Sequence, residues 1–142
     1  EVNSRHFQER VEATNENAVE LVEWLKERPE VKSLWHPSTV CTGYYDALRR
    51  DGGGYGALIS LELHGGEEAA AAFYDRLRIS KGPSLGTNFS LVCPYTLLAH
   101  YKELDWAAER GAPRNLLRIW VGLEEADDLE ERFEQALDIG DL

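Results

Sequence analysis

One stretch decides the fold: LLRIWVGLEE, residues 116–125. Its aliphatic residues alternate, which predicts a β-strand with one face on a hydrophobic core. That face carries Leu117, Ile119, Val121 and Leu123. Arg118 and Trp120 occupy the opposite face, and the acidic run that follows has the apolar spacing of an amphipathic helix.

Arg118 is a charged residue in an otherwise apolar strand. Its guanidinium stays protonated and needs a partner or water. The partner is either an Asp or Glu of the same chain or the carboxylate of a ligand, which a planar guanidinium binds through two parallel hydrogen bonds. The residues alone favour the internal ion pair.

Apolar periodicity and turn-forming residues divide the rest of the chain into helices and strands. Helices are predicted over residues 4–28, 67–77, 104–110 and from 127 onward, with helical turns over 44–50 and 95–101. Further strands are predicted over 31–36, 57–63 and 89–93. With 142 residues, the chain suits a single α+β domain: a small mixed or antiparallel sheet covered by helices and preceded by a long helix.

Composition limits the possible partners. The net charge is −11, and residues 123–142 hold nine acidic residues against one basic residue, so nucleic-acid binding is not expected. No apolar run approaches the roughly 20 residues of a membrane-spanning helix. Cys41 and Cys93 match no metal-binding spacing and the histidines are scattered, so no metal site is expected. The lone thiols favour a reducing compartment, the cytoplasm.

The residues show no catalytic machinery of their own. Ser84 lies in the turn-rich stretch from Ser80 to Asn88, without a neighbouring base motif or a GxSxG sequence. Lys81 lies in the same stretch, and a lysine amine is the group that forms a Schiff base with a carbonyl compound. The sequence gives no sign of the burial that would lower its pKa, so a surface lysine is expected.

Five segments follow one another in the order of a known family. They are Asn17-Ala18, Leu25 with Pro29-Glu30-Val31, Gly56 with Ser60-Leu61-Glu62-Leu63, Ser84-Leu85-Gly86, and the run 117–124. This order resembles the C-terminal domain of the Cys/Met-metabolism pyridoxal-phosphate enzymes, which have fold type I. The runs 82–88, 93–101 and 103–106 look most like the cystathionine γ-synthase branch found in fungi.

The resemblance implies a substrate-binding role. In the family, the arginine that matches Arg118 binds the substrate α-carboxylate, with help from the serine that matches Ser84 and from nearby backbone. Arg118, Ser84 and Leu85 are therefore the expected substrate-binding residues. The family's Schiff-base lysine, the aspartate at the pyridine nitrogen and the phosphate-binding groups belong to a larger upstream domain, and none matches here. Pyridoxal 5'-phosphate is thus expected in the parent enzyme, while the isolated chain is expected neither to hold it nor to catalyse.

The resemblance also implies a parent reaction and partners. The parent would join an O-acylhomoserine to cysteine by γ-replacement, giving cystathionine for methionine biosynthesis. Residues 1–142 would be its small domain, and residues 1–28 a long helix linking to the large one. The absence of methionine fits a chain cut from a longer protein. The parent is expected to be a homotetramer. A cystathionine lyase, an acylhomoserine sulfhydrylase and a free-standing regulatory or binding α+β domain remain alternatives.

Two residues depart from the family pattern. The usual serine after the Arg-Ile pair is Trp120, and the usual second glycine of the Ser-Leu-Gly-Gly turn is Thr87. Trp120 shares a strand face with Arg118, so it is expected to narrow the pocket or to shield the arginine.

Overall fold

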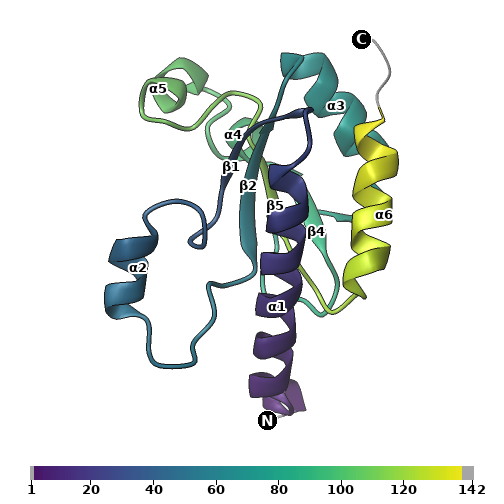
Figure 1. Cartoon of the computed structure of the whole chain (residues 1–142). Helices are drawn as coiled ribbons and strands as arrows, with labels where there is room; N and C mark the ends of the chain where they lie inside the picture. The colour runs from purple at the N-terminus through teal and green to yellow at the C-terminus, as the bar shows by residue number, and fades with distance from the viewer. Residues whose placement is uncertain (1, 139–142) are drawn as a thin grey trace.

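The computed structural model describes residues 2–138 and has an α+β architecture built on one five-stranded sheet (Figure 1). The strands are β1 (Val31–Trp35), β2 (Leu58–Leu63), β3 (Ser80–Lys81), β4 (Leu91–Pro94) and β5 (Leu117–Trp120). Their order is β1-β2-β5-β4-β3, with β3 and β4 parallel and the other neighbours antiparallel. The predicted mixed sheet is confirmed, with β5 at its centre.

The helices pack mainly on one face of this sheet. They are α1 (Phe7–Lys26), α2 (Thr42–Leu48), α3 (Gly66–Arg76), α4 (Tyr95–Ala99), α5 (Leu104–Glu109) and α6 (Ala126–Leu137), after a short 3-10 helix η1 (Val2–Ser4). Helix α6 contacts both α1 and α3, and these three helices share a core with the aliphatic side of the strands (Figure 1). Within residues 2–138, no helix is both long and apolar enough to cross a membrane.

The alternation predicted in residues 116–123 is confirmed from Leu117 to Val121, whereas Leu123 lies beyond the end of β5, is only half-buried and is not part of the core. Leu117, Ile119 and Val121 are buried, whereas Arg118 and Trp120 are half-buried on the opposite face of the sheet. Ile119 pairs with Ile59 of β2 on one side and with Val92 of β4 on the other, so its side is the centre of the core.

Helix α1 is shorter than the predicted helix 4–28, and it is also shorter than the linking helix expected over residues 1–28. It begins at Phe7 because His6 adopts a left-handed conformation, with φ of 53°. It ends at Lys26, ahead of the residue that Pro29 forces out of the helical region. Its buried residues begin only at Thr14, and Phe7 is 62% exposed. The first turns of α1 thus extend beyond the core (Figure 1).

The connection between β1 and β2 stands apart from the main body (Figure 1). It carries α2, which has no buried residue. His36 joins the start of this connection to its end. Its Nε2 lies 3.1 Å from the carbonyl oxygen of Gly56, and its Nδ1 lies 2.8 Å from the Ser38 hydroxyl. His36 is only 1% exposed, so these bonds satisfy a buried imidazole.

Candidate functional site

The site starts at Arg118, on the face of β5 that turns away from the helical core. Strand register places Arg118 between Ser60 of β2 and Cys93 of β4. Its Nη2 donates a hydrogen bond to the carbonyl oxygen of Pro83 at 2.7 Å, and its guanidinium carbon lies 5.0 Å from the centre of the Tyr95 ring. None of the ion pairs formed by residues 2–138 includes Arg118. The internal ion pair that the residues alone favour is therefore absent from the described part.

Among the described residues, no acidic side chain compensates the charge of Arg118. Burial raises the pKa of the Cys93 thiol, and the neighbouring guanidinium opposes that rise only in part. The thiol is therefore neutral near pH 7. A guanidinium has five N–H donors; one of them bonds Pro83, and the group also donates toward the Cys93 thiol. The remaining donors are suited to an external carboxylate.

The segment that Arg118 contacts is the turn containing Ser84 and Leu85. Both residues are exposed, and the Ser84 hydroxyl makes no hydrogen bond with any described residue. Gly86 has φ of 78°, a left-handed conformation that glycine adopts without strain. The structure thus brings Arg118 to the residue that precedes Ser84 and leaves the predicted binding groups of the turn open. Their role in substrate binding stays a prediction.

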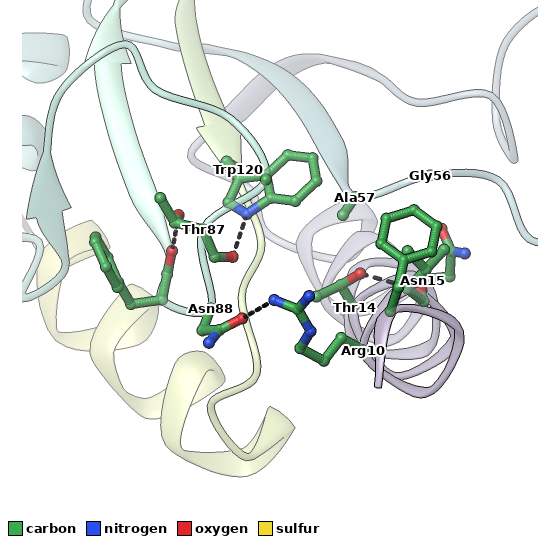
Figure 2. A pocket seen from close by; sticks show the side chains of 12 residues that line it. Arg10, Thr14, Asn15, Gly56, Ala57, Thr87, Asn88 and Trp120 are labelled. Atoms are coloured by element: carbon green, nitrogen blue, oxygen red, sulfur yellow. Dashed lines mark hydrogen bonds between the residues drawn. The ribbon is translucent and has the colours of Figure 1, made fainter. Parts of the chain in front are cut away.

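Trp120 is bonded to the far end of the same turn. Its indole Nε1 donates to the carbonyl oxygen of Thr87 at 2.9 Å (Figure 2). The ring also forms one wall of a hollow of about 640 Å³, whose opposite wall comes from Arg10 and Thr14 of α1 (Figure 2). Trp120 therefore holds the turn as well as limiting the space beside it.

Two side chains that were not predicted as site residues complete this region. Arg10 of α1 donates to the side-chain oxygen of Asn88 at 3.0 Å, which joins the first helix to the turn (Figure 2). These residues lie 78 positions apart, and no sequence motif connects them. Asn17 of α1 donates to the carbonyl oxygens of Gly122 and Glu124 at 3.1 and 2.7 Å. It lies in one of the segments that carry the family resemblance.

Comparison with known proteins identifies the family. Residues 5–138 match the model of the Cys/Met metabolism PLP-dependent enzymes. The chain belongs to this family. It is 48% identical to the cystathionine gamma-synthase of Neurospora crassa, over 99% of this chain and 23% of that protein. With the cystathionine gamma-synthase of Saccharomyces cerevisiae it shares 41% identity, over 97% of this chain and 22% of that protein.

The same relationship holds in three dimensions. The cystathionine gamma synthase of Xanthomonas oryzae pv. oryzae, solved in complex with cystathionine, superposes with a TM-score of 0.82 and 32% identity. The match covers 94% of this chain and 35% of that one. The chain thus spans about a quarter of the length of its curated relatives and aligns with their C-terminal part.

Members of the Cys/Met metabolism PLP-dependent family use pyridoxal phosphate, a cofactor that forms a Schiff base with a lysine. Lys26 and Lys32 are paired at the surface with Glu23 and Glu62, and Lys102 is exposed. Lys81 is exposed, as expected of a surface lysine, although partial desolvation lowers its pKa.

Lys81 nevertheless has a structural partner. Its ammonium donates to the carbonyl oxygens of Tyr74 and Leu77 at the end of α3, where the helix dipole favours a cation. It also lies 4.6 Å from the centre of the Tyr74 ring. The described lysines therefore do not fit a Schiff-base site. Among residues 2–138, no three His, Cys, Asp or Glu side chains cluster as metal ligands.

Proposed function

We propose that this chain is the C-terminal, substrate-carboxylate-binding domain of a longer pyridoxal-phosphate enzyme of transsulfuration. The parent reaction is the replacement of the acyloxy group of an O-acylhomoserine by the thiol of cysteine, which gives cystathionine. Similarity to two fungal cystathionine gamma-synthases along nearly the whole chain supports this reaction. The observation that carries the proposal is Arg118, which has no carboxylate partner among residues 2–138 and contacts the exposed turn at Ser84.

Arg118 binds the α-carboxylate of the amino-acid substrate through its remaining N–H donors. The Ser84 hydroxyl and the backbone of Leu85 lie on the same turn and add further hydrogen bonds to that anion. Two charge-assisted bonds together contribute about 3 kcal/mol, or roughly a hundredfold in binding. When bound upstream, the pyridoxal phosphate supplies the electron sink for the reaction, while this domain binds and orients the substrate. By itself, the chain does not catalyse.

The exposed start of α1 supports an upstream partner domain. Phe7 is 62% exposed and Val11 is 39% exposed, and both precede the buried part of the helix. Residues four apart on a helix are neighbours, so Phe7 and Val11 form one apolar patch of the kind that another domain covers, and an upstream domain would lie next to it in the chain. We infer that the N-terminal half of α1 packs on that domain, in a parent that is a homo-oligomer.

The test is an assay of the full-length protein. It is incubated with pyridoxal phosphate, an O-acylhomoserine and cysteine, and cystathionine is measured by mass spectrometry. Faster use of sulfide than of cysteine would indicate a sulfhydrylase, and cleavage of added cystathionine would indicate a lyase. A full-length protein that binds no pyridoxal phosphate and forms none of these products would overturn the proposal.

A further inference from the structure

Two side chains on one face of β5 hold the two ends of the turn at Ser84. Arg118 donates to the carbonyl oxygen of Pro83 at 2.7 Å, and the Trp120 indole donates to that of Thr87 at 2.9 Å. Residues two positions apart on a strand point to the same side. The two bonds therefore lie side by side and flank residues 84–86.

Asn88, the residue after Thr87, is held by Arg10 and by the backbone N–H of Leu123, but residues 84–86 are not held in this way. Outside the helices and strands, no backbone hydrogen bond formed within residues 2–138 uses the N–H of Ser84, Leu85 or Gly86. The left-handed Gly86 adds a position with wide conformational freedom. The orientation of residues 84–86 thus depends on what holds their two ends.

The two departures from the family pattern meet in one of these bonds. Trp120 is the donor and Thr87 supplies the acceptor. The Thr87 hydroxyl also donates to the carbonyl oxygen of Phe89 at 2.6 Å. A threonine has fewer accessible backbone conformations than the glycine usual there, so both residues restrict the turn.

We infer that Trp120 is a positioning residue, which orients the Ser84-Leu85 turn for the substrate carboxylate by holding the carbonyl oxygen of Thr87. The inference rests on the proposed function, because it concerns the same site. Trp120 acts through the turn, whereas Arg118 contacts the anion. Loss of the indole N–H should therefore weaken binding only of ligands that carry the α-carboxylate.

The test uses Trp120→Phe in the full-length protein, which keeps an aromatic ring and removes the N–H. The KM for the O-acylhomoserine should rise about fivefold, the effect of one ordinary hydrogen bond, with kcat changed less than about twofold. Inhibition by homoserine should weaken by the same factor, while inhibition by the amine that lacks its carboxylate should not change.

Trp24→Phe is the matched control. Trp24 is also half-buried and packs against the same core, but it lies in α1 and no described hydrogen bond joins it to the turn, so KM should stay at the wild-type value.

Thr87→Gly is the second variant, in case Trp120→Phe does not fold. It keeps the accepting carbonyl but frees the turn, so it should produce the same selective weakening. Unchanged KM and homoserine inhibition in the folded variants would overturn the inference while wild-type activity upholds the proposed function. Equal weakening of homoserine and of the amine would also overturn it, because Trp120 would then be only a wall of the pocket. A wild-type protein without activity would remove the proposed function, and the inference with it.

Discussion

The carboxylate of Glu124 accepts two hydrogen bonds from Ser90, one from its backbone N–H at 2.8 Å and one from its hydroxyl at 2.9 Å. Ser90 is 1% exposed, and its hydroxyl also accepts a bond from the N–H of Gly122 at 2.8 Å. This network joins the residue that follows the turn to the connection between β5 and α6. It therefore holds the segment after the turn next to the end of β5, the strand that carries Arg118 and Trp120.

Replacing Glu124 by glutamine should destabilise the 142-residue chain. In either orientation of the new amide, its NH2 group faces Ser90, either the backbone N–H or the hydroxyl that already accepts from Gly122. One buried donor then lacks an acceptor. The free energy of unfolding, measured by urea denaturation, should fall by about 1–2 kcal/mol. Glu125→Gln alters an exposed neighbour and should change it by less than about 0.5 kcal/mol. Equal effects of the two variants would refute this role of the network.

Gly122→Ala should be more damaging. A Cβ at position 122 would lie 2.5 Å from the carbonyl carbon of Phe89, closer than real Cβ contacts come, so the backbone would have to move. We expect the free energy of unfolding to fall by about 2 kcal/mol. Gly43→Ala is the control, since no atom lies within 4 Å of its added Cβ and alanine favours the helix α2. A stable Gly122→Ala variant would show that the turn does not approach β5 so closely.

The two thiols should react at very different rates. Cys41 is exposed, whereas Cys93 is 2% exposed and burial raises the pKa of its thiol. Because the thiolate is the nucleophile, iodoacetamide at pH 8 should label Cys41 quickly and Cys93 only after denaturation. Peptide mass mapping over time measures both rates. Rapid labelling of Cys93 in the folded chain would contradict its position in β4.

His36 should make stability fall as the solution becomes acidic. Burial lowers the pKa of His36 below its ordinary value of 6.5, and the bond to the Gly56 carbonyl only partly opposes this shift. The unfolded chain then binds more protons than the folded chain, so the contribution is complete above about pH 6.5 and is lost as pH falls toward the folded pKa.

Unfolding free energies at pH 7.5 and 5.5 measure this loss. His36→Gln should show a smaller decrease between these values than the wild type, whereas replacing the exposed His64 by glutamine should keep the wild-type decrease. If His36→Gln and the wild type lose stability in parallel, His36 is not the responsible group.

The sequence predicted those parts of the fold that depend on local patterns. Alternation in residues 116–123 placed Arg118 opposite the core, and the turn-forming residues bounded most helices and strands correctly. The start of α1 was wrong because the left-handed conformation of His6 follows no local pattern. The hydrogen bond from Trp120 to Thr87 joins residues 33 positions apart, and only the folded sheet shows which carbonyl the indole reaches. The partial desolvation that lowers the pKa of Lys81 likewise arises from its contact with the end of α3.

The central claim is that Arg118 binds the substrate carboxylate, and the most direct measurement is kcat/KM of the full-length Arg118→Ala variant for the O-acylhomoserine. Arg110→Ala, at an exposed arginine next to α5, is the control and should retain wild-type kinetics. We predict that Arg118→Ala lowers kcat/KM by roughly a hundredfold or more while pyridoxal phosphate remains bound. An unchanged kcat/KM in a folded, cofactor-bound Arg118→Ala variant would contradict the assignment of this arginine to the substrate site.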